Sequence, residues 1–262
     1  MSDTEQSSIR QAAGEIAAKV GNDLAYFTLI ADLTTWRHRC RFALAPSGAL
    51  AARYLDLPFA AVSFYGDTEV VQTALRSLLD PGEHAYALIG EVQRAQLETI
   101  VNVQNVELEW QAVYPNRMAF PGNAPALNAG DAVPLSRAVP LSAADWPAMV
   151  SLGERGGVYA LETTALDKGP YFGVWRDGKL VSMAGTRLRL DWAGEIGNVV
   201  TDPDYRRQGL ATMVVAVTTQ ALQAAGLQVI LHVFQSNAGA VACYEHMGFV
   251  RLRTMHLVEF VL

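Results

Sequence analysis

The stretch that most restricts the fold of this 262-residue chain is residues 201–212, TDPDYRRQGLAT. An apolar run at residues 195–201 predicts a strand before it, and an amphipathic run at residues 208–225 predicts a helix after it. The loop between them has the pattern R-x-x-G-x-A, formed by Arg206, Gly209 and Ala211. A helix start offers unpaired N–H groups and the positive end of the helix dipole, so small side chains there leave room for an anion. The pattern alone equally fits an ordinary strand–helix turn with solvated arginines.

A second motif follows the next predicted strand, residues 229–234. Residues 237–247 predict a helix that ends at Gly248. The motif is S-N-x-x-A-x-x-x-Y-E-x-x-G-F, formed by Ser236, Asn237, Ala240, Tyr244, Glu245, Gly248 and Phe249. Upstream, Asp177-Gly178 predicts a tight hairpin turn between strands at residues 171–175 and 179–190. The second half of the chain therefore alternates strands and helices around two motifs.

These two motifs, in this order and spacing, resemble the GNAT N-acyltransferase superfamily over about residues 135–262. The resemblance implies an α/β fold with a mixed, mostly antiparallel sheet flanked by helices. It also implies that the sheet splays between the strands at residues 195 and 229 to hold coenzyme A. The implied reaction is acetyl transfer from acetyl-CoA, or another short acyl-CoA, to a primary amine by direct attack in a ternary complex, with no metal.

The resemblance also assigns a cofactor site. Its phosphate-binding loop comprises Arg206, Arg207, Gln208, Gly209, Leu210, Ala211 and Thr212. Main-chain groups of Val199, Val200 and Thr201 would pair with the pantetheine arm as an added strand would, and one N–H would polarise the thioester carbonyl. Asn237 and Ala240 would complete the site. For Asn237, a plain N-cap role is an equally good interpretation.

Tyr244 is the first catalytic candidate. It lies seven residues after Asn237, almost two helical turns, so both share one helix face. A phenol is protonated at neutral pH and can donate a proton to the departing thiolate. The alternative role for Tyr244 is a half-buried aromatic that supports the sheet.

The base is harder to assign from sequence. Glu195 lies eleven positions before Arg206, where some family members carry a general base. A carboxylate is a poor base unless burial raises its pKa or a water relays the proton, and Glu195 equally fits an ion pair with Arg187. His232, in the middle of a predicted strand, fits a half-buried histidine better than a base. Cys243 is expected to face away from the cleft, since adjacent helix positions point about 100° apart.

The first half of the chain predicts a smaller α/β domain. Residues 58–65 and 84–89 predict strands, while residues from Asp67 and residues 91–101 predict helices. We expect an N-terminal accessory domain at residues 1–120, a linker at 121–134 rich in Pro, Gly, Asn and Ala, and the acyltransferase domain at 135–262. The first domain lacks R-x-x-G-x-A and fits a degenerate GNAT-like copy.

The composition and charge of the chain indicate which kinds of binding partner to expect. The net charge is −6 without a long basic run, so we expect no nucleic-acid partner and no membrane surface. The polar N-terminus does not fit a secretory signal, and Cys40 and Cys243 lack metal or redox spacing, which together predict a cytoplasmic protein. A small-molecule amine is the first expected acceptor, and a homodimer is left open. The alternatives are a non-catalytic acyl-CoA sensor or assembly module, and a protein N-terminal or lysine acetyltransferase.

Overall fold

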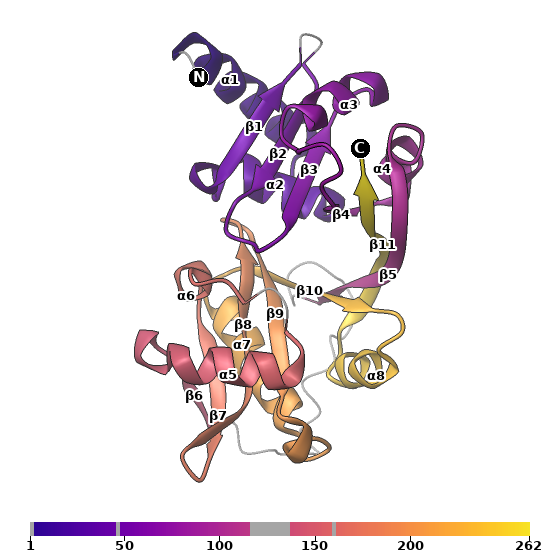
Figure 1. The fold of residues 1–262 in the computed structure, drawn as a ribbon. Coiled ribbons are helices and arrows are strands. Elements are labelled where there is room, and N and C mark those ends of the chain that lie inside the picture. The colour runs from indigo at the N-terminus through magenta and orange to yellow at the C-terminus, as the bar shows by residue number, and fades with distance from the viewer. Residues whose placement is uncertain (1–2, 46–47, 116–136, 159–160) are drawn as a thin grey trace. The chain divides into compact units, whose positions relative to one another are not determined.

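A computed structural model describes residues 3–45, 48–115, 137–158 and 161–262 (Figure 1). The chain forms two compact units. Unit 1 comprises Met1–Glu109 with Thr254–Leu262, and unit 2 comprises Trp110–Arg253. Strand β5 (Asn102–Tyr114) begins in unit 1 and ends in unit 2, whereas β11 (Val250–Val261) does the reverse.

The last nine residues belong to unit 1 because of their strand pairing. β11 pairs antiparallel with β4 (Ala85–Ile89), from His256 opposite Ile89 to Phe260 opposite Ala85. From the sequence, residues 254–262 were expected to belong to the acyltransferase domain. The predicted linker at 121–134 lies outside the described residues.

Unit 1 is an α/β unit whose strand order is β1-β2-β3-β4-β11. Its remaining elements are α1 (Asp3–Val20), η1 (Leu24–Tyr26), α2 (Phe27–Leu33), η2 (Arg37–Arg39), β1 (Cys40–Leu44), β2 (Leu50–Tyr54), β3 (Ala60–Tyr65), α3 (Thr68–Arg76) and α4 (Glu91–Leu97). β3, α3 and β4 confirm the sequence-based prediction. α4 is shorter than predicted, because the chain enters β5 at Asn102.

Unit 2 has a mixed sheet with the strand order β10-β9-β8-β7-β6. Its elements are β6 (Ala138–Pro140), η4 (Ala143–Asp145), α5 (Trp146–Gly156), α6 (Ala165–Lys168), β7 (Tyr171–Arg176), β8 (Lys179–Arg189), β9 (Ala193–Thr201), η5 (Pro203–Tyr205), α7 (Leu210–Ala224), β10 (Gln228–Phe234) and α8 (Ala238–His246). β6, β7, β8 and β9 pair antiparallel, and β10 pairs parallel with β9. This is the predicted mostly antiparallel sheet.

Local sequence signals explain the turns of unit 2. Asp177 and Gly178 have φ values of 50° and 75°, so the predicted hairpin turn joins β7 to β8. Ser142 begins η4, and both its N–H and its hydroxyl donate to the Asp145 carboxylate at 2.8 Å. Gly248, with φ 93°, follows α8 and lets Phe249 N–H donate to Tyr244 O at 3.0 Å.

Helices α5 and α7 cover opposite faces of the sheet of unit 2 (Figure 1), and an apolar layer lies under each. One layer joins α7 to the sheet and includes Met213, Val214, Leu231 and Tyr244. The other joins α5 to the opposite face and includes Met149, Leu152, Met183 and Val200. Because helices cover both faces of this sheet, the candidate site lies where β9 and β10 separate.

The parallel pair β9–β10 separates after four residue pairs. Its register runs from Ala193 opposite Gln228 to Ile196 opposite Leu231 and stops there. On the other edge of β9, the register with β8 shifts between Met183 and Gly185, which marks a bulge. Asn198 sits in this bulge with φ 51°. The predicted splay is therefore present, and residues 197–201 of β9 extend beyond the pairing with β10.

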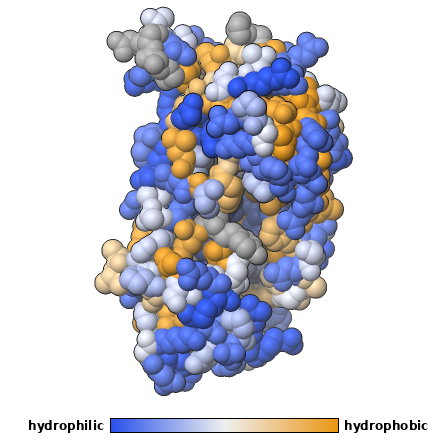
Figure 2. Space-filling view, in the orientation of Figure 1, coloured by the Kyte–Doolittle hydropathy of each residue, from blue (hydrophilic) through white to orange (hydrophobic). Residues whose placement is uncertain are grey.

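The face drawn in Figure 2 is mostly hydrophilic, with apolar residues showing between polar ones. Among the helices in the described ranges, none is long and apolar enough to cross a membrane.

Candidate active site

The loop between β9 and α7 has an unusual backbone. Arg207 has φ 63° and Gly209 has φ 73°, so two residues of the loop adopt the left-handed conformation. Gly209 is the N-cap of α7, and its carbonyl accepts from Met213 N–H at 3.0 Å. Left-handed residues turn successive N–H groups toward one concavity, as in anion-binding loops. The loop is thus shaped to present amides together.

These amides are available to a ligand. In the described part of the chain, the N–H groups of residues 207–212 donate to no protein acceptor. Arg206, Arg207, Gln208 and Gly209 are exposed, whereas Leu210 is buried in the core beneath them. An exposed helix start with free amides and two guanidinium groups favours a bound anion. The amides and the two arginines of this loop are therefore the groups that a diphosphate requires.

The residue before the loop is a buried carboxylate. Asp202 is 2% exposed, and its Oδ2 accepts from Arg155 Nε at 2.8 Å and lies 2.9 Å from Lys179 Nζ. Its Oδ1 accepts from Asp204 N–H at 3.1 Å. Hydrogen bonds from Lys179 and Arg155 hold the pKa of Asp202 at about 2. Asp202 therefore joins α5 and the β7–β8 hairpin to the start of the loop.

The free edge of β9 offers main-chain groups beside the loop. Asp202 N–H donates to Val181 O at 2.9 Å, so this residue faces β8. Strand alternation then turns the main-chain groups of Val199 and Thr201 away from β8, toward the gap left by β10. Arg206 Nε donates to Thr201 O at 3.3 Å. Val200 faces β8 with its main chain and packs its side chain against α5.

A buried tyrosine supports the bulge. Asn198 Nδ2 donates to Tyr171 Oη at 2.8 Å. Tyr171 is 1% exposed, and burial raises the pKa of its hydroxyl. A Cβ at Gly185 would lie 2.2 Å from the Tyr171 ring, so only glycine fits beneath it. The bulge is therefore held by the hydrogen bond to Tyr171 and by the packing of that ring over Gly185.

Helix α8 carries the second motif. Asn237 is its N-cap, and Oδ1 accepts from Ala240 N–H at 3.1 Å, as the N-cap interpretation predicts. Ala240 packs against the core on the α7 side. Tyr244 is 8% exposed, packs edge-to-face on Phe249 with ring centroids 6.0 Å apart, and has its pKa raised by burial. Its hydroxyl is therefore protonated at neutral pH.

Glu195 is held as a buried anion. Arg187 Nε and Nη2 donate to its two oxygens at 2.9 and 3.0 Å. Burial acts to raise the pKa of Glu195, but the charges and hydrogen bonds of Arg187 and His232 outweigh it and lower the pKa to about 2. Such a carboxylate has little affinity for the proton of an amine. The geometry favours the ion-pair interpretation over the general base.

His232 belongs to the same network. Its Nδ1 lies 2.9 Å from Glu195 Oε1, and its Nε2 lies 3.1 Å from Gln111 Nε2 on β5. The His232 side chain is 5% exposed. Both ring nitrogens therefore have protein partners, which matches the half-buried histidine expected from the sequence.

Cys243 lies beside the start of α7. Its Sγ is 3.4 Å from Thr212 Oγ1 in the first turn. Helix α8 is rotated so that Cys243 meets α7 while Tyr244 enters the core, a geometry that the 100° spacing alone does not fix.

The structure adds residues that sequence reasoning did not select. Asp202, Asn198 and Tyr171 shape the loop and the bulge, and Gln111 reaches the site from a strand outside the motifs. Asn198 had one local signal, because asparagine tolerates positive φ better than most residues. The other three act through contacts distant in sequence.

Comparison with known proteins adds a family match for unit 2. A model of the Acetyltransferase (GNAT) family matches residues 140–249. The [Ribosomal protein bS18]-alanine N-acetyltransferase of Escherichia coli strain K12 is 33% identical over 115 residues, which cover 42% of this chain and 77% of that protein.

Two solved structures resemble more of the chain. A putative GNAT-family acetyltransferase from Novosphingobium aromaticivorans has a TM-score of 0.63 and 25% identity, covering 80% of this chain and 88% of that one. A tandem GNAT protein from the clavulanic acid biosynthesis pathway has a TM-score of 0.62 over 99% of this chain and 95% of that one. At 14% identity, the second similarity concerns the fold alone.

Proposed function

The chain belongs to the GNAT acetyltransferase family, and on that premise we propose that it transfers an acetyl group from acetyl-CoA to a primary α-amine. The observation that carries this proposal is the set of free amides at the start of α7, next to the open edge of β9. Diphosphate at the loop and pantetheine along β9 would occupy these two features together. The fit supports acetyl-CoA as the cosubstrate.

In this proposal each group has one task. The amides of residues 207–212 bind the diphosphate, with Arg206 and Arg207 adding positive charge. Main-chain N–H groups of Val199 or Thr201 stabilise the negative charge that develops on the thioester oxygen. Tyr244 donates its proton to the departing thiolate, since burial keeps its hydroxyl protonated.

The proton of the attacking amine goes to water in this proposal. Glu195 is ion-paired, and the nitrogens of His232 already have partners. A site without a strong base favours amines that are partly neutral beforehand. At pH 7.5 about a third of α-amino groups are neutral, but only about one lysine ε-amine in a thousand, from their ordinary pKa values. This argues for an α-amine over lysine.

The first proposed acceptor is the N-terminal α-amine of a protein or peptide. The support is the Escherichia coli relative, whose name states that it acetylates the alanine of a ribosomal protein. A free small-molecule amine, the first expectation from the sequence, is the second candidate.

A thiol-release assay with acetyl-CoA separates these acceptors. The panel contains a peptide with N-terminal alanine, the same peptide with a blocked N-terminus and an internal lysine, and free amino acids. We expect release with the first peptide and none with the blocked one. Release with the amino acids alone would select the second candidate. Silence across the panel, with acetyl-CoA binding intact, would favour the sensor or assembly module.

Unit 1 is proposed to be a degenerate copy of the same fold. The tandem GNAT similarity over 99% of this chain supports this interpretation. The lack of an R-x-x-G-x-A pattern in residues 1–120 of the sequence also supports it.

A further inference from the structure

The two units repeat one order of elements. In unit 1 a helix pair precedes three antiparallel strands, β1, β2 and β3, then α3, the parallel strand β4 and α4. In unit 2 the pair α5–α6 precedes β7, β8 and β9, then α7, the parallel strand β10 and α8. The gap between β3 and β4 is therefore the counterpart of the gap between β9 and β10.

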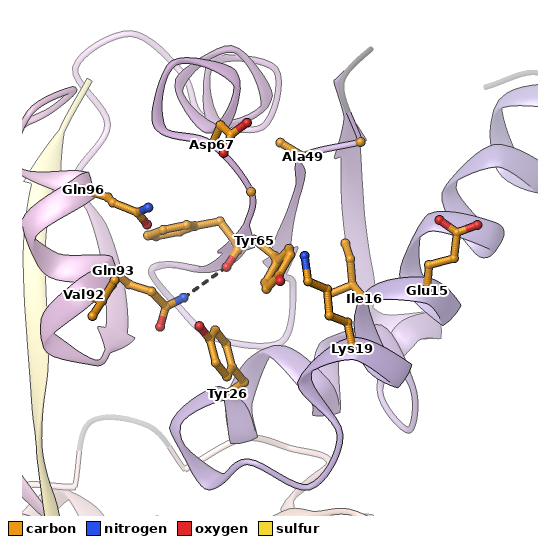
Figure 3. Close-up of a pocket in the computed structure, with 13 residues that line it drawn as sticks. Glu15, Ile16, Lys19, Tyr26, Ala49, Tyr65, Asp67, Val92, Gln93 and Gln96 are labelled. Atoms are coloured by element: carbon orange, nitrogen blue, oxygen red, sulfur yellow. Dashed lines mark hydrogen bonds between the residues drawn. The ribbon is translucent and has the colours of Figure 1, made fainter.

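Unit 1 has a cavity at that gap. β3 pairs with β4 only through Ala60 opposite Ala85 and Ala61 opposite Tyr86. Beyond these pairs lies a cavity of about 480 Å³. Figure 3 shows side chains that line it from α1, η1, β3, the turn after β3 and α4: Ile16, Lys19, Tyr26, Tyr65, Asp67 and Gln93. Its volume lies in the range of small-molecule sites.

A diphosphate does not suit this cavity. The turn before α3 is Gly66-Asp67, and Glu69 lies in the first turn of the helix. Two carboxylates at the helix start repel the phosphate oxygens that the arginines of unit 2 would attract. The edge of β3 is also engaged, because Gln93 Nε2 donates to Phe64 O at 3.2 Å.

Within the described ranges, the cavity presents three polar groups that form neither a hydrogen bond nor an ion pair: the Lys19 ammonium, the Asp67 carboxylate and the Gln93 side-chain oxygen. Lys19 Nζ lies 5.4 Å from the centroid of the Tyr65 ring and forms no ion pair. Asp67 begins α3 without a side-chain cap bond and forms no ion pair. Gln93 is 8% exposed, and its Nε2 donates to Phe64 O, as the dashed line in Figure 3 marks. By contrast, the Glu15 carboxylate already accepts from Gln11 at 3.0 Å.

Lys19 and Asp67, both exposed, are the cation and the anion of this lining whose side chains form no hydrogen bond in the described ranges, and together they suit a ligand with both charges. Ile16, the Tyr26 ring and the Tyr65 ring supply an apolar wall, with the two tyrosine centroids 6.0 Å apart. Burial raises the pKa of Tyr26, so its hydroxyl remains a donor at neutral pH. We propose that this cavity binds a zwitterion, either a free amino acid with a large side chain or a dipeptide. The carboxylate binds at Lys19, the ammonium at Asp67, and the side chain against the tyrosine rings.

Calorimetry on the full chain tests this site with phenylalanine, phenylalanyl-alanine, phenethylamine and 3-phenylpropionate. We expect one of the two zwitterions to bind with a Kd of about 1 mM or below, and each single-charge analogue at least about tenfold more weakly. Comparing the Kd of phenylalanine with that of phenylalanyl-alanine shows whether the site prefers a free amino acid or a dipeptide. Equal binding of an analogue that lacks either charge would overturn the charge assignment, and so would binding of neither zwitterion.

Two variants locate the bound molecule. Lys19→Met keeps the apolar stem, and Asp67→Asn keeps the shape, so each should weaken binding at least about tenfold. Glu15→Gln, on the same wall but already hydrogen-bonded, is the matched control and should leave binding unchanged. None of the three should alter basal thiol release, because unit 2 holds the transferase site. Zwitterion binding that persists in both variants would place the ligand elsewhere and contradict the proposal.

Discussion

Arg187 and Glu195 are joined by two hydrogen bonds, from Nε to Oε1 at 2.9 Å and from Nη2 to Oε2 at 3.0 Å. The carboxylate is 2% exposed, and His232 Nδ1 lies 2.9 Å from the same Oε1. Glu195 is thus a structural anion at the point where β9 and β10 separate. Its pKa of about 2 leaves it ionised throughout the range in which an amine attacks.

The first prediction concerns Glu195→Gln. Loss of a general base ordinarily costs about 10²–10⁴ in rate, and we expect this variant to lose less than about tenfold in kcat/KM. The free energy of unfolding should fall by about 3 kcal/mol, because Arg187 and His232 lose a buried partner. Urea unfolding and a pH–rate profile measure both. A rate loss of several hundredfold together with loss of the acidic limb would restore Glu195 as the base.

The second prediction concerns acid stability. The folded pKa of Glu195 is lowered to about 2, below its ordinary value, so its contribution is present above that ordinary value. The contribution should be lost as pH falls from about 5 to about 2. The free energy of unfolding of the parent should therefore fall more steeply across this window than that of Glu195→Gln. Parallel pH dependences of the two proteins would show that the carboxylate titrates normally in the folded state.

The third prediction concerns Tyr244→Phe. Removing the hydroxyl should lower kcat by about a hundredfold, because the thiolate loses its proton donor. The Kd for acetyl-CoA should change by less than about twofold, since the ring and its packing on Phe249 remain. Steady-state kinetics and calorimetry separate the two effects, with Tyr86→Phe in unit 1 as the control. An unchanged kcat on every accepted amine would remove Tyr244 from the mechanism.

The fourth prediction concerns Asp202→Asn. An amide pairs less strongly with Lys179 and Arg155, so the start of the loop should lose its fixed position. We expect KM for acetyl-CoA to rise about tenfold while kcat falls less than twofold, a split that indicates lost ground-state binding. Asp191→Asn, in the turn before β9, is the control. A fall in kcat at constant KM would mean that Asp202 acts in the chemical step instead.

Much of unit 2 was predictable because its signals are local. The Asp177-Gly178 turn, the glycine after α8 and the alternation of strands and helices are each decided within a few residues. The loop motif likewise selected the helix start that proves exposed and open. The separation of β9 and β10 was predicted from the resemblance to the GNAT family, because no local sequence pattern indicates it.

The remaining features depend on distant contacts. The pairing of β11 with β4 joins residues 256–260 to residues 85–89, and no periodicity in either strand reveals its partner. Residues 106–112 alternate apolar and polar side chains, which is a strand signal. The buried face of β5 does not follow this pattern, because Glu109 and Gln111 are buried whereas Leu108 is 43% exposed. Glu195 was ambiguous for a related reason, since its role depends on whether Arg187 and His232 reach it.

The most direct test of the account is acetyl-CoA binding by Gly209→Glu and Gly226→Glu. The two glycines begin and follow the same helix with φ values of 73° and 76°, so both substitutions impose similar backbone strain. Only the first places a carboxylate among the amides proposed to bind the diphosphate. Calorimetry on both folded variants should show binding abolished by Gly209→Glu and retained by Gly226→Glu. Binding by Gly209→Glu as tight as in the parent would contradict the proposed site.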